Sequence, residues 1–409
     1  MYLCNMKQII LTSAFLVLSA LNMVAQSDVN QYVATWSTAI QLVEPHNMPP
    51  SPFLNGNSLR QIVQVSIEGK EVVLKLSNEY NKENTEIVGV ELACASTAGS
   101  SADVEEKSSV SVTFGGNKGI TMTPGQTIDS DPVKFKLTSR MNVAITIHFG
   151  ECSVKTISGH PGSRTTSYIA EGNTSDFTSA TKTDHWYYIN SLLVPSRKKN
   201  CSIAVLGNSI TDGRGTTTNG QNRWTDILSK RLLQNKKTKN ISVLNKGLGG
   251  NCVLFGGLGP TGNSRFERDV LNQEGVKYAI IFEGVNDIGG SRNGMDTANR
   301  LIDSFKAMIE KAHAKGIKIF GATIMPIKGN GYYNEDREKG RQYVNNWIRT
   351  TDLFDGFIDF DAVMSDPEHP DQLNPAYLFE NDYLHPNADG YLRMGESIDL
   401  DLFTKLFVK

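Results

Sequence analysis

The spacing of apolar residues changes near Pro195, and this change constrains the fold of the chain most strongly. Before it, apolar and polar residues alternate in short segments, separated by turn signals such as Gly115-Gly116-Asn117. The segments are 62–67, 72–76, 109–114, 133–137 and 143–149. Alternation with period two is typical of strands with one buried face. We therefore predict an N-terminal all-β domain over 27–190, with a sandwich or jelly-roll-like arrangement.

After Pro195 the chain alternates strand-like and helix-like segments, the signature of a parallel sheet covered by helices. The expected strands are 202–206, 241–244, 278–282, 317–322 and 357–360. An apolar stripe of period 3.6 over 298–312 predicts the clearest helix, with Gly316 as its cap, and 391–408 is the expected last helix. The fold class is therefore α/β, with a three-layer α/β/α, flavodoxin-like second domain over 200–409.

Ser209 follows the first of these strands, at the end of the sheet where open α/β folds bind their ligands. A serine hydroxyl becomes a good nucleophile when a histidine takes its proton, and a carboxylate fixes the tautomer of that histidine. Asp382 and His385 are three residues apart, so one turn of chain can present both side chains on the same side. Ser209, Asp382 and His385 are therefore a candidate nucleophile, acid and base.

Four blocks of the second half resemble those of the SGNH, or GDSL-like, esterase and lipase family. They are GNS at 207–209, GLGGN at 247–251, GVND at 284–287 and DYLH at 382–385. The resemblance implies hydrolysis of carboxylic esters through an acyl-enzyme, with Ser209, Asp382 and His385 as the catalytic triad. It also implies an oxyanion hole made by the backbone N–H groups of Ser209 and Gly250 and the side-chain amide of Asn286.

The sequence departs from the family's pattern at Asn208, where an acidic residue usually precedes the nucleophile. The triad stays whole because its carboxylate comes from Asp382, although hydrogen bonds around the serine loop are expected to change. The α/β-hydrolase alternative needs G-x-S-x-G, and the second glycine is missing at Thr211.

Two other patterns in the sequence have simpler interpretations than a second site. Residues 257–262 fit G-x-G-x-x-G, but a poor strand precedes them, so a loop is favoured over a dinucleotide site. His160, in Gly-His-Pro-Gly, is interpreted as a turn residue that could line a cleft if the first domain packs over the second.

The first 25 residues have the pattern of a cleavable signal peptide, with Lys7, an apolar core at 9–18 and small residues up to Ala25. This predicts a secreted or periplasmic protein without a stable membrane span, since the apolar run is short. A net charge of −2 gives no indication of a nucleic-acid partner. We expect no metal or other cofactor. The cysteines beyond the leader are favoured to be free thiols, although one pair could be bridged in an oxidising compartment.

The predicted function is that of a secreted serine esterase that removes acyl groups from a glycan ester or another small acylated substrate. The carbohydrate part of this prediction is an analogy with two-domain relatives. The β domain is expected to contribute substrate fit or stability and none of the covalent chemistry. The alternative is a glycan-binding protein whose hydrolase half has lost its activity.

Overall fold

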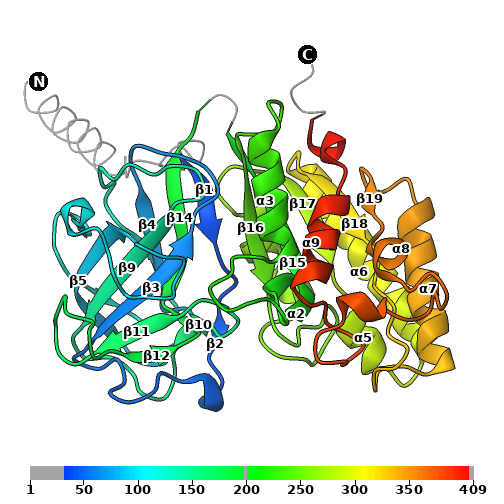
Figure 1. Ribbon diagram of the computed structural model, residues 1–409, viewed down its shortest axis with the longest axis horizontal. Helices are drawn as coiled ribbons and strands as arrows, with labels where there is room; N and C mark the ends of the chain where they lie inside the picture. Colours follow the sequence, from blue (N-terminus) through cyan, green and yellow to red (C-terminus); the bar gives the residue numbers. More distant parts are fainter. Residues whose placement is uncertain (1–31, 198–199, 405–409) are drawn as a thin grey trace, which may run out of the picture.

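The computed structural model describes residues 32–197 and 200–404. Figure 1 shows two parts side by side, an N-terminal part made mostly of strands and a C-terminal part in which helices surround a sheet. The predicted signal peptide, 1–25, lies outside the described residues. Within the described ranges, no helix combines the length and the apolar character that crossing a membrane requires.

Antiparallel sheets build the N-terminal part. Its strands are β1 (Tyr32–Ser37), β2 (Gln41–Leu42), β3 (Ser58–Gln64), β4 (Val73–Ser77), β5 (Thr85–Cys94), β6 (Val110–Val112), β7 (Ile120–Met122), β8 (Thr127–Asp129), β9 (Asn142–Phe149), β10 (Ser158–His160), β11 (Ser167–Ala170), β12 (Thr181–Thr183), β13 (Trp186–Tyr187) and β14 (Ile189–Pro195). One sheet has the order β1-β14-β4-β8, a second has β12-β11-β3-β9-β5-β6 with β7 on β5, and a small third has β13-β10-β2. Leu59, Leu74, Ile145 and Leu192 from the two larger sheets share one apolar core.

The antiparallel β fold predicted for the N-terminal part is confirmed, and β9 matches the predicted strand at 143–149 closely. The predicted strand at 133–137 is wrong, because Val133 and Leu137 make only isolated bridges, to Val72 and Gly69. The sequence did not indicate β5, whose pairing with β9 shifts register at Gly89 and so breaks the alternation of its side chains.

A five-stranded parallel sheet with the order β16-β15-β17-β18-β19 organises the described C-terminal part. Its strands are β15 (Cys201–Gly207), β16 (Ile241–Gly247), β17 (Val276–Phe282), β18 (Lys318–Ala322) and β19 (Phe357–Ile358). This is the predicted flavodoxin-like order, 2-1-3-4-5 along the chain. Every residue of the interior strand β15 is buried, as expected for a strand covered on both faces.

Helices and short helical turns lie between and after these strands, and two of the short turns belong to the N-terminal part. They are α2 (Ser209–Asp212), α3 (Trp224–Gln234), α4 (Gly262–Phe266), α5 (Val285–Gly289), α6 (Gly294–Ala314), α7 (Glu335–Thr350), α8 (Phe360–Met364) and α9 (Ala388–Ser397), with the turns η1 (Pro45–Asn47), η2 (Glu106–Ser108), η3 (Glu267–Leu271), η4 (Pro375–Tyr377) and η5 (Leu400–Phe403). Helix α3 packs against α9, and α6 packs against α7. The predicted stripe of α6 is buried, and Gly316 beyond its end is left-handed, with φ +67°.

Two predicted boundaries in this part are wrong. The strand predicted at 357–360 ends at Ile358, because the side chain of Asp359 accepts a hydrogen bond from the Ala362 N–H and caps α8. The helix predicted at 391–408 begins earlier, at Ala388, and α9 ends at Ser397, because Ile398 is extended and the separate turn η5 follows.

The two parts pack directly against each other, and β1 contacts β16. The Ala34 N–H donates to the Glu274 carbonyl at 3.0 Å, and Lys75 forms an ion pair with Glu274. Lys246 is 1% exposed, and its ammonium donates to the Ser37 hydroxyl and, at 2.7 Å, to the Thr38 carbonyl. Burial lowers the pKa of Lys246 to about 8.

Candidate active site

Ser209 lies just beyond the carboxyl end of β15, an interior strand of the parallel sheet. Strand β15 ends at Gly207, the side chain of Asn208 accepts a hydrogen bond from the Ile210 N–H at 3.1 Å, and Ser209 begins α2. A Cβ at Gly207 would lie 2.2 Å from the Thr211 hydroxyl, so the tight turn requires glycine. Strand, cap and turn together place the serine hydroxyl at the edge of the sheet where ligands of open α/β folds bind.

A continuous chain of hydrogen bonds links Ser209 to Asp382. Ser209 Oγ lies 2.8 Å from His385 Nε2, and His385 Nδ1 lies 2.6 Å from Asp382 Oδ2. Asp382 Oδ1 accepts from the backbone N–H groups of Leu384 and His385, at 2.9 and 2.8 Å. Burial opposes ionisation of Asp382, but the hydrogen bonds from His385 and these N–H groups outweigh it and lower the pKa of the carboxyl group. The imidazole is therefore oriented toward the serine by an ionised carboxylate.

The loop that carries the acid has an unusual backbone. Glu380, Asn381 and Tyr383 have φ between +51° and +54°, a left-handed conformation that non-glycine residues adopt at an energetic cost. Asn330 donates its side-chain N–H to the Asp382 carbonyl at 2.6 Å and so ties the loop to the segment after β18.

The residues predicted for the oxyanion hole line the same cleft as Ser209 and His385. Gly250 is left-handed, with φ +63°, which favours glycine. The Asn286 side chain donates one N–H to the Asn251 carbonyl at 2.8 Å, and its Oδ1 accepts from the Tyr332 hydroxyl at 3.0 Å. A carboxamide has two N–H donors, so this orientation leaves the second one for a ligand.

Tyr332 and Asp287 support this arrangement, although sequence reasoning gave neither a role. Tyr332 packs closely on Gly289, where a Cβ would lie 2.2 Å from its ring, and its hydroxyl fixes the orientation of the Asn286 amide. The Asp287 carboxylate accepts from the Val253 and Leu254 N–H groups, both at 2.9 Å, and so holds the loop after Gly250. The Asn-Asp pair in the GVND block is the signal that could have indicated the role of Asp287.

A buried polar network lies beneath the serine turn. Asn208 donates its side-chain N–H to Glu283 Oε2 at 3.1 Å, so a carboxyl group just after β17 faces the asparagine that replaces the usual acid. The Arg265 guanidinium donates to the Gly207 carbonyl at 2.9 Å, to Asn251 Oδ1 at 3.0 Å and to Glu283 at 3.5 Å. Burial raises the pKa of Glu283 to about 8, against the opposing effect of Arg265.

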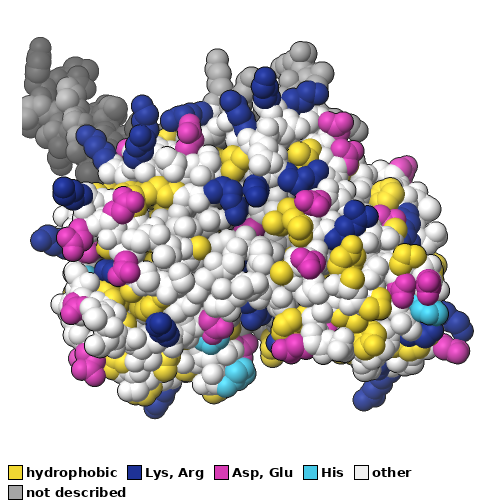
Figure 2. All heavy atoms as spheres, viewed as in Figure 1, with side chains coloured by type: hydrophobic (Ala, Val, Ile, Leu, Met, Phe, Trp, Pro, Cys, Tyr) yellow, Lys and Arg dark blue, Asp and Glu magenta, His cyan; other side chains and the backbone are white. Residues whose placement is uncertain are grey.

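Both parts of the chain line the cleft, whose volume is about 360 Å³. The C-terminal part contributes the apolar and aromatic side chains of Leu258, Tyr332 and Leu384 together with the charged Asp212 and Arg214. The N-terminal part contributes mainly polar side chains, among them Gln41, Glu44 and Arg164. On the face drawn in Figure 2, a notch separates the two parts at the lower edge, with histidine side chains close by.

The structure also places the remaining candidates. His160 is the last residue of β10, so its interpretation as a turn residue is wrong. It lines the cleft, as expected for the case in which the first domain packs over the second. Residues 257–261 form a loop that leads into α4. Cys94, Cys152, Cys201 and Cys252 are free thiols. Among the described side chains, no group of three or more His, Cys, Asp or Glu is arranged to hold a metal ion.

Residues 205–393 match the model of the GDSL-like lipase/acylhydrolase family. Similar solved structures include a GDSL-like lipase from Bacteroides thetaiotaomicron, 22% identical over 51% of this chain and 91% of that one, with a TM-score of 0.37. A catalytic mutant of an acetylxylan esterase from Geobacillus stearothermophilus is 21% identical over 50% of this chain and 96% of that one, with a TM-score of 0.38. The comparison with curated proteins gives no match.

Proposed function

Residues 205–393 belong to the GDSL-like lipase/acylhydrolase family, whose members hydrolyse carboxylic esters, and on this premise we propose that the chain is a serine esterase. Ser209 is its nucleophile, His385 its general base and acid, and Asp382 the carboxylate that orients His385. The observation that carries this proposal is the unbroken chain of hydrogen bonds from Ser209 Oγ through His385 to Asp382.

In the proposed mechanism, Ser209 Oγ attacks the ester carbonyl while His385 Nε2 takes the hydroxyl proton. The tetrahedral intermediate collapses when His385 gives this proton to the leaving alcohol, and an acyl-serine remains. A water molecule then attacks the acyl-serine with His385 again as the base. The carboxylic acid leaves, and Ser209 regains its proton.

The oxyanion of each tetrahedral intermediate is proposed to accept hydrogen bonds from three donors. Ser209 is the first residue of α2, where a backbone N–H has no acceptor within the helix. Gly250 contributes a second backbone N–H, and Asn286 contributes the side-chain N–H that Asn251 does not use. Fixed donors of this kind stabilise charge that develops only in the transition state.

We further propose an acylated carbohydrate or another small polar ester as the substrate, and secretion through the predicted leader. The support for the substrate is that both apolar and polar side chains line the cleft. Leu258 and Leu384 suit an acyl group, whereas Gln41, Glu44 and Arg164 suit a hydroxyl-rich alcohol.

The test is turnover of a chromogenic short-chain acyl ester by the full chain and by Ser209→Ala. We expect Ser209→Ala to keep the wild-type melting temperature and to lower kcat by several orders of magnitude. A panel of acylated glycans and long-chain lipid esters then identifies the alcohol. An inactive wild-type protein that still binds glycans would favour the alternative function, a glycan-binding protein on a hydrolase scaffold.

A further inference from the structure

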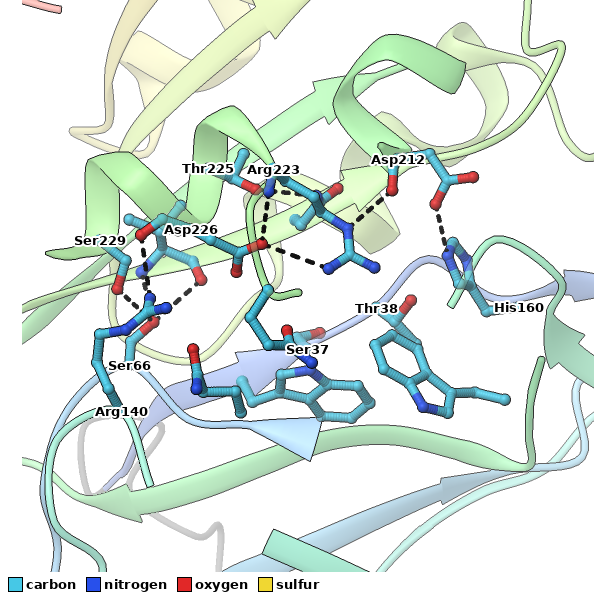
Figure 3. Close-up of a pocket in the computed structure, with 16 residues that line it drawn as sticks. Ser37, Thr38, Ser66, Arg140, His160, Asp212, Arg223, Thr225, Asp226 and Ser229 are labelled. Carbon is cyan, nitrogen blue, oxygen red and sulfur yellow. Dashed lines mark hydrogen bonds and ion pairs between the residues drawn. The ribbon is translucent and has the colours of Figure 1, made fainter. Parts of the chain in front are cut away.

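The N-terminal part of the chain encloses the carboxylate of Asp212, the last residue of the helix that Ser209 begins. The enclosing segment is 160–164, His-Pro-Gly-Ser-Arg, and we call it the 160–164 segment. His160 Nε2 lies 2.8 Å from Asp212 Oδ1, with side-chain exposures of 4% and 3%. Figure 3 shows these two side chains facing each other from the two parts of the molecule.

The hydrogen bonds of His160 fix how its ring is protonated. Its Nδ1 lies 2.9 Å from the Ala39 carbonyl, which can only accept, so Nδ1 carries a proton. Its Nε2 faces a carboxylate oxygen, so a second proton lies between His160 and Asp212. Hydrogen bonds of this charge-assisted kind are about twice as strong as neutral ones. His160 therefore has no ring nitrogen left to accept a proton from a substrate.

Two other residues of the 160–164 segment contact the same carboxylate. A Cβ at Gly162 would lie 1.8 Å from Asp212 Oδ2, so only glycine allows the backbone to approach so closely. Arg164 Nη2 lies 3.8 Å from Asp212 Oδ2. From the C-terminal part, Arg223 donates to the Asp212 carbonyl at 2.8 Å and also to the Ser163 carbonyl, which ties helix and segment together.

Helix α2 is a single turn, so the position of its end determines the position of its beginning. The Asp212 N–H donates to the Asn208 carbonyl and the Gly213 N–H to the Ser209 carbonyl, both at 2.9 Å. The Ser209 hydroxyl must in turn meet His385 within hydrogen-bond distance, and a displacement of about 1 Å can lower a catalytic rate on the order of 100-fold.

We propose that His160 and Asp212 are positioning residues for Ser209, so that the N-terminal part of the chain completes the alignment of the nucleophile. This inference rests on the proposed role of Ser209. His160 takes part in no bond-making step, because both of its ring nitrogens are engaged by Ala39 and Asp212. It acts through α2, and its removal changes the reactivity of Ser209.

The test measures how fast an activated p-nitrophenyl phosphonate labels the serine of the full-length protein. In this reaction Ser209 Oγ forms a bond to phosphorus, p-nitrophenolate leaves, and His385 takes the serine proton. We expect His160→Ala and Asp212→Ala each to slow labelling ~10–100-fold. The double variant should be labelled no more slowly than the slower single variant, because both substitutions remove the same contact between His160 and Asp212.

Asp212→Asn serves as the conservative variant. Its carboxamide can donate to Nε2 of a neutral His160 that keeps its Nδ1 proton on Ala39, so the contact survives. We expect it to recover most of the rate that Asp212→Ala loses. The matched control is Tyr80→Phe, which removes another contact between the two parts, the 2.6 Å hydrogen bond from Arg268 to the Tyr80 hydroxyl. It should lower the melting temperature and leave the labelling rate unchanged.

Rates are compared per folded molecule by circular dichroism, and mass spectrometry identifies the labelled residue. If the wild-type protein is not labelled on Ser209, the proposed function is wrong. If Ser209 is labelled and folded His160→Ala reacts at the wild-type rate, only the positioning inference is wrong. If His160→Ala does not fold, the labelling rates of Asp212→Ala and Asp212→Asn are compared instead. Equal labelling rates for these two variants would overturn the inference.

Discussion

Two histidine–aspartate pairs lie beside Ser209, and the chain builds them in different ways. Asp382 and His385 share one turn of a loop, whereas His160 and Asp212 are 52 residues apart and join the two parts of the molecule. His385 keeps Nε2 for the serine hydroxyl, but both ring nitrogens of His160 already have acceptors. A histidine next to a carboxylate can therefore act as a base only where one ring nitrogen remains available.

The strongest contrast between the two pairs should appear when each aspartate becomes asparagine. Asp382→Asn removes the acceptor that holds the Nδ1 proton of His385, and loss of the correct tautomer lowers kcat by ~10³–10⁴. Asp212→Asn keeps a hydrogen bond to His160 and should cost far less. Steady-state kinetics on one activated ester measures both variants. Equal losses would contradict the assignment of different roles to the two pairs.

The next largest effect is expected at Asn286, which belongs to the C-terminal part alone. Asn286→Ala removes a donor that matters mainly in the transition state, so kcat should fall by ~10²–10³ with KM changed much less. Asn286→Asp should be at least as damaging, because it brings an acceptor to the developing negative charge. Since the donor does not act through α2, the free-energy effects of Asn286→Ala and His160→Ala should add.

If the Asn286→Asp variant is stable and active, Asn286 is not a donor of the oxyanion hole. Its side chain would then serve only to hold the loop through Asn251 and Tyr332. The melting temperature of each variant is the control for such a structural role.

A smaller effect is expected at the beginning of α2, where the cap residue Asn208 contacts Glu283 of the C-terminal part. Above pH 8, where Glu283 is ionised, Asn208→Asp keeps the oxygen that caps Ile210 but sets a second carboxylate against Glu283 in place of a donor, and we expect a loss of about 2 kcal/mol in unfolding free energy. Adding Glu283→Gln returns a donor, so the double variant should regain stability. Urea unfolding of the single and double variants measures the coupling, and simple additivity would show that the two side chains do not act together.

The smallest effect is a pH dependence of stability at Asp382. Its pKa is lowered in the folded state, so the carboxylate stabilises the fold above the pKa of the unfolded chain, and this contribution is lost as the pH falls through the folded value. The melting temperature of the wild-type protein should therefore exceed that of Asp382→Asn by a constant amount down to about pH 5, and the difference should shrink below about pH 4. A difference that does not change with pH would mean that Asp382 is not ionised in the fold.

Local patterns made most of the fold and the candidate triad predictable from the sequence. Ser209 and Asn286 each follow a strand, and a parallel sheet brings strand ends to one edge. Asp382 and His385 need only one turn to meet. Errors at the ends of elements, such as the strand predicted at 357–360, came from a cap that the apolar pattern does not reveal.

The partners of these residues could not be predicted because they depend on contacts between distant segments. The sequence indicated a turn at His160 and a cleft position if the domains pack together, but not its contact with Asp212, which joins the two parts. Tyr332 reaches Asn286 from 46 residues away. The replacement at Asn208 became interpretable only when Glu283 was found beside it, at the end of the neighbouring strand.

The burial of Lys246 makes this residue a natural reporter of whether the two parts of the molecule stay together. Its amine is enclosed by Ser37 and Thr38 from the N-terminal part, so an acylating reagent cannot reach it while the interface is closed. Exposed lysines such as Lys306 should be modified within minutes, whereas modification of Lys246 has to wait for the interface to open. The rate at which the Lys246 adduct appears, followed by mass spectrometry, would therefore report how often the interface between the two parts opens.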